Sequence, residues 1–133
     1  MESGCGETLS EPGRDPRWNV TGAFPDRVRE QSTLDGTVTI TNATDRNIAG
    51  LSASRPDVYV TQHGRIVALP LPRDDVGVVL ELAPGGARDY DAAGSLRRCS
   101  DQQPLAPGRY ELHALLRIGD ATAVGGPWPL EVE

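Results

Sequence analysis

The two histidines are the first candidates for chemistry, and their positions argue against metal binding or acid-base catalysis. His63 precedes a glycine between two apolar segments, and His113 lies on the polar side of an alternating stretch. Neither has a carboxylate or a thiol at the sequence spacing that a zinc site or a catalytic pair requires. Both are therefore interpreted as solvated side chains.

Four aspartates come next. Asp89 and Asp91 flank a tyrosine at a period of two and share one face of a strand, while Asp74 and Asp75 lie in a loop. Oxygen-rich loops can hold calcium, but the chain contains no D-x-[DN]-x-[DN]-G string. These acids are interpreted as part of an ordinary solvated surface.

The motifs of nucleophilic and phosphate chemistry are missing from the sequence. It has no G-x-S-x-G elbow, phosphate loop or HExxH pair, and Ser95 lacks the strand-to-helix context of a nucleophile elbow. An enzymatic site would need His63 or His113 beside an acid in a pocket. We therefore expect no catalytic residue, no cofactor and no metal ion, and predict that the protein is not an enzyme.

Cys5 and Cys99 are the only thiols and stand too far apart for a zinc or CxxC redox motif. A disulfide between them would pin the Gly- and Pro-rich first 16 residues to the rest of the chain. Such a bond favours an oxidising, extracytoplasmic compartment. Two alternatives remain open, namely two unpaired thiols, and acylation of Cys5 in the lipobox-like string Ser3-Gly4-Cys5.

The charge balance argues against nucleic acid as a partner. The net charge is −6, and all 13 basic residues are arginines that occur singly except at Arg97-Arg98. A protein that binds a phosphate backbone presents a positive stripe, and the sequence offers none. It also contains no apolar run long enough for a transmembrane segment.

The elements that must position these residues are short strands. Only 5% of the residues are aromatic, and 15 glycines with 11 prolines in 133 residues favour many turns over long helices. Residues 34–41 and 109–118 alternate apolar and polar side chains, as a strand with one buried face does. The sequence predicts a flexible arm over residues 1–16 and an all-β antiparallel sandwich of seven or eight strands over residues 17–133.

One hairpin is expected to turn at His63-Gly64. A two-residue turn there places Val60 opposite Val67 and gives the hairpin one apolar face. Residues 70–75, with two prolines, are expected to be irregular because proline removes backbone donors and restricts its neighbours.

The tetrapeptide Leu-Ala-Pro-Gly occurs twice, at residues 82–85 and 105–108. A Pro-Gly pair suits the centre of a type II turn, so each copy indicates a reversal of the chain. The first copy predicts a hairpin between residues 76–82 and 87–90. Residues 109–118 follow the second copy and are expected to pair with residues 128–132 across a Gly-rich loop.

In this order the features resemble those of bacterial immunoglobulin-like domains. The resemblance rests on the Thr/Val strand that ends in Asn42-Ala43-Thr44, the strand Val58-Tyr59-Val60 with its glycine-containing tip, and the two Pro-Gly turns. Over residues 34–118 the chain is most similar to the bacterial intracellular proteinase inhibitor type. The resemblance implies an immunoglobulin-like sandwich in which Tyr110 is a structural tyrosine corner. The two cysteines depart from an intracellular family and favour an exported relative.

Binding through loops on a rigid scaffold is the function that remains. Residues 69–76, stiffened by prolines and expected to expose Arg73, are the first candidate loop, and residues 121–128 are the second. The predicted contact residues are Leu71, Pro72, Arg73 and Asp74. The leading hypothesis is a non-catalytic, exported bacterial domain that binds another protein, with a protease as one candidate. The alternative is an accessory or structural domain of the cell envelope, held by a lipid or a stalk.

Overall fold

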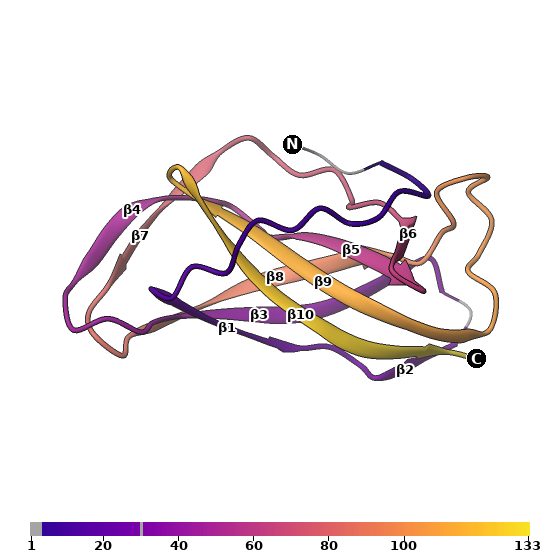
Figure 1. Ribbon diagram of the computed structural model, residues 1–133, viewed down its shortest axis with the longest axis horizontal. Coiled ribbons are helices and arrows are strands. Elements are labelled where there is room, and N and C mark those ends of the chain that lie inside the picture. The colour runs from indigo at the N-terminus through magenta and orange to yellow at the C-terminus, as the bar shows by residue number, and fades with distance from the viewer. Residues whose placement is uncertain (1–3, 30) are drawn as a thin grey trace.

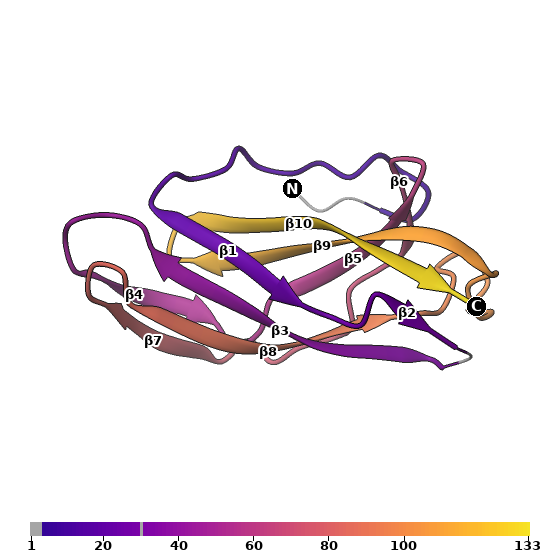
Figure 2. The same cartoon turned by 90° about the horizontal axis from the view of Figure 1, so that it is seen from below.

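A computed structural model describes residues 4–29 and 31–133, which form ten strands and no helix. The strands make two sheets that face each other, as Figures 1 and 2 show from two directions. This architecture confirms the predicted all-β sandwich. The described part of the chain has more strands than the seven or eight predicted, because it includes short segments such as β2 (Arg27–Val28) and β6 (Arg65–Ala68).

The smaller sheet has the strand order β1-β3-β8 and is antiparallel throughout. Its strands are β1 (Trp18–Ala23), β3 (Thr33–Asn42) and β8 (Ala87–Ser95). The central strand β3 buries Val38 and Ile40 completely and turns its threonines away from the core. This alternation is the one that the sequence predicts.

The larger sheet has the order β2-β10-β9-β4-β7, and β5 also pairs with β9 while β6 pairs with β5. Its other strands are β4 (Ile48–Ala53), β5 (Asp57–Gln62), β7 (Gly77–Leu82), β9 (Gly108–Ile118) and β10 (Ala121–Val132). Strand β9 crosses the middle of this sheet and buries every second side chain from Tyr110 to Ile118. The period of two in the sequence therefore marks the true core face.

The predicted hairpin of residues 76–82 with 87–90 is wrong. Strand β7 pairs with β4 in the larger sheet, whereas β8 pairs with β3 in the smaller sheet. The turn between them crosses from one sheet to the other and is held by Asn42, whose carbonyl oxygen accepts a hydrogen bond from Gly85 N at 2.9 Å. The Pro-Gly signal located the turn correctly, but a turn signal does not specify which strands pair.

The hairpin of β5 and β6 does turn at His63-Gly64, where both residues have positive φ (54° and 79°). Glycine reaches this region without steric cost, which suits it to the tight turn. The predicted register is wrong by one residue beyond Thr61, because the ladder shifts and Val60 lies opposite Ala68 instead of Val67. A β-bulge inserts one extra residue into one strand of a pair, and an alternating pattern does not reveal it.

The Gly-rich segment predicted as a loop belongs to strand β10, which pairs with β9 from Ala121 onward and has a bulge between Gly125 and Trp128. The glycines make room for the Trp128 indole. A Cβ added at Gly22 or at Gly125 would lie 2.7 Å from an indole carbon. Trp128 packs against Phe24 with ring centroids 5.5 Å apart and is half-buried against the core. The second candidate loop therefore does not exist.

Candidate functional site

The first candidate loop, residues 69–76, connects β6 to β7 without regular structure. Pro72 and Asp74 are exposed, while Leu71 and Arg73 are half-buried. Arg73 was predicted to be exposed but is half-buried, and its Nε lies 3.0 Å from Oδ1 of Asp57 at the start of β5. This ion pair fixes the middle of the loop to the sheet.

Exposed apolar side chains gather beside this loop. Leu51 on β4 and Val79 on β7 are cross-strand partners and are 61% and 64% exposed, and Val76 at the end of the loop is 68% exposed. We call these three residues the apolar patch. Leu69, at the other end of the loop, is the remaining large hydrophobic residue that is exposed in the described part of the chain. Exposed apolar side chains that lie close together can mark interaction sites.

Strand β7 lies at the end of the strand order in its sheet, and its backbone is partly covered. Arg88 on β8 donates from Nη1 to the carbonyl oxygen of Val79 at 2.8 Å. An uncovered edge strand would invite pairing with another chain, and a charged side chain on the edge opposes such pairing. The side chains of the apolar patch stay exposed beside this covered edge.

A groove of about 570 Å³ separates the loop from the N-terminal arm. The arm contributes Gly4 and Glu7, strand β5 contributes Asp57 and Tyr59, and the other wall is formed by residues 69–73 and Asp75. The groove is lined by prolines and leucines of the loop and by carboxylates of the arm and of β5. Its two walls come from segments that are far apart in the sequence.

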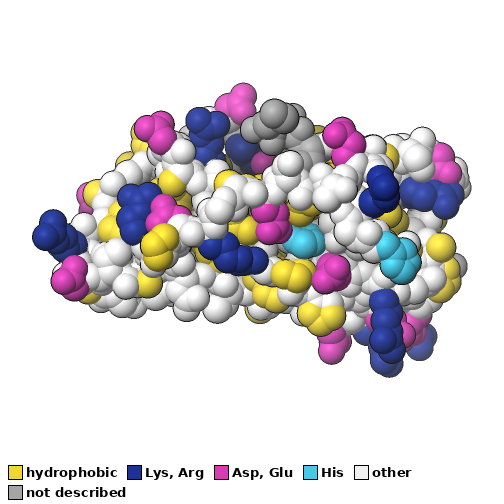
Figure 3. Space-filling view, viewed as in Figure 1, with side chains coloured by type: hydrophobic (Ala, Val, Ile, Leu, Met, Phe, Trp, Pro, Cys, Tyr) yellow, Lys and Arg dark blue, Asp and Glu magenta, His cyan; other side chains and the backbone are white. Residues whose placement is uncertain are grey.

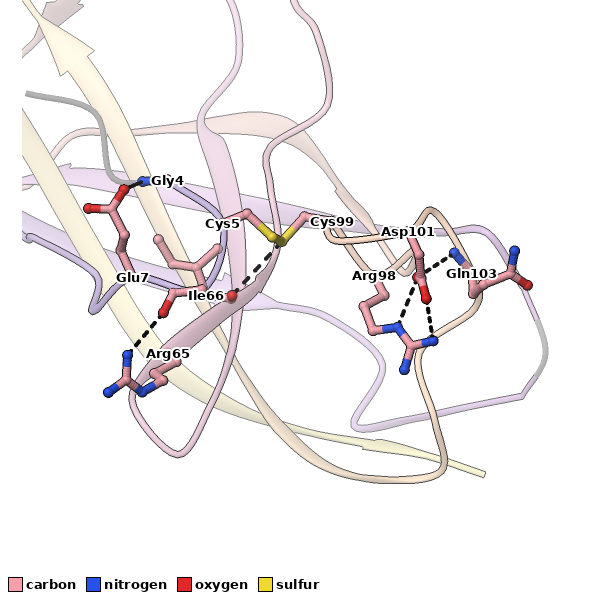
Figure 4. The surroundings of a disulfide bond; sticks show 10 residues. Gly4, Cys5, Glu7, Arg65, Ile66, Arg98, Cys99, Asp101 and Gln103 are labelled. Atoms are coloured by element: carbon pink, nitrogen blue, oxygen red, sulfur yellow. Dashed lines mark hydrogen bonds and ion pairs between the residues drawn. A yellow bond between two sulfur atoms is a disulfide. The ribbon is translucent and has the colours of Figure 1, made fainter.

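The arm is held by the disulfide between Cys5 and Cys99, whose Cα atoms are 5.8 Å apart (Figure 4). This pairing confirms the predicted bond. Next to it the arm extends the sheet, since Gly6 N donates to Ile66 O and Ile66 N donates to Glu7 O, both at 2.9 Å. The sequence predicted a flexible arm from its composition alone. Composition does not reveal these attachments to β6.

Further along, the arm lies over the outer face of the larger sheet (Figure 2). Arg14 Nη1 donates to the carbonyl oxygen of Val124 at 2.9 Å, and Glu11 Oε1 lies 2.7 Å from Nδ1 of His113. Tyr59 and Thr61 alternate with the inward valines of β5, yet both are buried. The arm therefore forms a third layer that covers part of the sheet.

Nε2 of His113 also lies 2.9 Å from Oγ1 of Thr61. The hydroxyl of Thr61, the imidazole of His113 and the carboxylate of Glu11 therefore contact one another in a row. Nucleophilic triads have this order of contacts. The Thr61 side chain is only 1% exposed, so a substrate carbonyl has no access to Oγ1. The arrangement fastens the arm to β5 and β9. The sequence could not reveal it, because Glu11 and His113 are 102 positions apart.

The other residues considered for chemistry stay separate. His63 is exposed at its hairpin tip, and Asp89 accepts a hydrogen bond from the Thr39 hydroxyl at 2.6 Å. Asp74 and Asp75 are exposed in the loop. Among the described residues, no group of three or more His, Cys, Asp and Glu side chains is placed to hold a metal ion. The face of the molecule in Figure 3 mixes acidic and basic side chains.

Tyr110 lies at the start of β9, directly after the second Pro-Gly turn. Its hydroxyl donates to the carbonyl oxygen of Ala106 at 2.6 Å and ties the turn to the strand. This is the contact implied by the resemblance to a tyrosine corner. Burial raises the pKa of Tyr110 above its usual value of 10.0 because it disfavours the phenolate.

We expect Tyr110→Phe to lower the free energy of unfolding by about 1 kcal/mol, since it removes one buried hydrogen bond. The raised pKa adds a pH dependence, in which the contribution of the neutral phenol is complete below pH 10.0 and lost as the pH rises through the folded-state pKa. Urea denaturation of both proteins from neutral to alkaline pH measures this. The difference between them should shrink at alkaline pH, and a constant difference would contradict the assignment.

Comparisons with known proteins agree with the fold and go no further. No family model and no curated protein matches the chain. A CARDB domain from Pyrococcus furiosus is similar at 14% identity and a TM-score of 0.48 over 90% of this chain and 97% of that one. The alkylpurine DNA glycosylase AlkC of Pseudomonas fluorescens matches at 12% identity, with a TM-score of 0.51 over 88% of this chain.

A β-glucosidase from Listeria innocua is also similar, at 14% identity and a TM-score of 0.46 over 86% of this chain. The chain spans only 16% of that enzyme and 30% of the DNA glycosylase. Nothing in these comparisons indicates the proteinase inhibitor type. The described residues contain no helix long and apolar enough to cross a membrane.

Proposed function

We propose that the chain is a non-catalytic, exported immunoglobulin-like domain that binds a protein partner through the apolar patch and the adjoining loop 69–76. One observation carries this proposal. Every exposed large hydrophobic side chain in the described residues lies either at an end of this loop or on the β4–β7 strand pair next to it. Side chains such as these give up unfavourable contact with water when a partner covers them.

Two further observations support the proposal. The Thr61 hydroxyl, which contacts His113 and through it Glu11, is buried and inaccessible to substrate, and this favours a binding role over catalysis. The Cys5–Cys99 bond is consistent with an oxidising, extracytoplasmic compartment. It also engages the thiol that a lipid anchor would acylate, so it favours a free domain over the lipid-anchored alternative.

We expect Val79→Asp to reduce capture of the partner from secreted and envelope fractions of the source organism at least about tenfold, because it places an unpaired carboxylate in an apolar contact. Asn19→Asp is the matched control, since it adds the same charge at an exposed position of β1, at the end of the strand order in the other sheet. Circular dichroism checks that both variants fold. Equal capture by wild type and both variants would contradict the proposed surface.

Protease inhibition is a narrower version of this proposal and has its own test. The protein is added at micromolar concentration to a panel of secreted serine proteases and their residual activity is measured. A loss of activity that Val79→Asp relieves and Asn19→Asp does not would support an inhibitor. Full activity of every protease in the panel would remove this version and leave protein binding in place.

A further inference from the structure

We infer that the groove between the arm and the loop 69–76 receives a lysine or arginine side chain of the protein partner, and that the Cys5–Cys99 disulfide completes this groove. The inference rests on the proposed function and adds the chemistry of the contact. It also makes binding depend on the disulfide, because one wall of the groove belongs to the arm that this bond holds.

The walls of the groove match the two halves of a long basic side chain. Tyr59 lies in it beside the leucines and prolines of residues 69–72, a surface that suits an aliphatic stem. Lysine and arginine side chains bury such stems along apolar surface while their charged ends stay at a polar rim. A small acidic or a purely apolar side chain would use only half of this groove.

The charges that line the groove favour a positively charged side chain of the partner. Glu7, Asp57 and Asp75 line it together with one cation, Arg73, and Nε of Arg73 is already paired with Asp57 at 3.0 Å. This leaves the carboxylates of Glu7 and Asp75 without a neutralising cation among the described lining residues. The net charge of the chain, −6, adds a long-range attraction for a basic surface.

The position of Glu7 depends on the disulfide two residues before it. Glu7 Oε1 accepts a hydrogen bond from Gly4 N at 3.1 Å, so Gly4 and Glu7 form one small unit on either side of Cys5 (Figure 4). A Cβ at Gly4 would collide with this carboxylate oxygen. The bond to Cys99 and the backbone contacts with Ile66 hold the unit against the groove. Reduction removes the covalent part of this attachment.

The test uses a fluorescein-labelled peptide with three arginines separated by glycines, and a counterpart with three glutamates. Fluorescence polarisation should show saturable binding of the arginine peptide, with no binding of the glutamate peptide. The double variant Glu7→Gln/Asp75→Asn should weaken binding about tenfold, as expected for the loss of two partly screened charge contacts. Cys5→Ser/Cys99→Ser should weaken it by a similar factor in a protein whose circular dichroism stays that of a sandwich.

The matched control is Asp35→Asn/Asp91→Asn, which removes the same charge from exposed positions of the smaller sheet. It should change the affinity less than about twofold, because distant surface charges are screened by salt. Equal weakening by both double variants, or no saturable binding up to about 1 mM peptide, would overturn the inference. Unchanged peptide binding by Glu7→Gln/Asp75→Asn would also overturn it, while a loss of partner capture in Val79→Asp would still support the proposed function.

Discussion

Replacing Cys5 and Cys99 by serine is expected to lower the free energy of unfolding by about 4 kcal/mol. The bond joins residues 94 positions apart, and a crosslink over so long a loop removes much conformational freedom from the unfolded chain. The arm would also lose its covalent support beside β6, where only a few backbone hydrogen bonds attach it. Among the covalent and noncovalent attachments of the arm, this bond is the strongest.

Denaturation in urea measures the effect in the oxidised wild type, the reduced wild type and the double serine variant. The last two should agree with each other, since both lack the crosslink and differ by two sulfur atoms. A difference of less than about 1 kcal/mol between the oxidised and the reduced protein would contradict the stabilisation expected from this crosslink.

Replacing Asn42 by alanine is expected to lower the free energy of unfolding by about 3 kcal/mol, since it removes the partners of three buried or partly buried backbone groups at once. Its Nδ2 donates to the carbonyl oxygens of Arg46 at 2.7 Å and Leu82 at 3.0 Å, and its Oδ1 accepts from Thr44 N at 2.9 Å. The side chain is almost completely buried. It joins the end of β3, the turn that follows it and the end of β7.

Asn47→Ala is the matched control for this substitution, because Asn47 lies in the same turn region and is exposed. It should change the free energy of unfolding by less than about 0.5 kcal/mol. Asn42→Asp keeps the size and the acceptor oxygen but loses both donors, so it should resemble the alanine variant. Asn42→Asp with wild-type stability would show that the donated hydrogen bonds contribute little.

The fold class could be predicted from the sequence because it depends on a local pattern. Strand β9 alternates core-facing and outward-facing side chains from residue 109 to 118, and the pattern shows this without knowledge of any partner strand. The turn at His63-Gly64 was predictable for the same reason, since backbone sterics act within a few residues. Both predictions are confirmed.

The strand partners were harder to predict, because pairing depends on contacts distant in the sequence. The segments before and after the first Pro-Gly turn look like a hairpin, yet each finds its partner in a different sheet. The glycines near Trp128 look like a loop, yet they accommodate an indole contributed by their own strand and covered from β1. A glycine in the sequence can indicate a close contact, but it does not identify the side chain that makes the contact.

The candidate site was predictable only in part. The loop 69–76 was located by its prolines, but the ion pair of Arg73 with Asp57 could not be predicted because the two residues belong to different elements. The groove and the contact of Glu11 with His113 depend on where the arm lies, and an irregular segment rich in glycine and proline carries no periodicity that could predict its path. Composition alone therefore described the arm as flexible.

The short crossing between β7 and β8 has a consequence for how the domain resists pulling and digestion. Because four residues carry the chain from one sheet to the other, and Asn42 fastens that passage to β3, neither layer can peel away while its neighbour stays intact. A domain whose layers open only together exposes few partly open forms to degradative enzymes. That quality would suit the extracytoplasmic location that we propose for this domain.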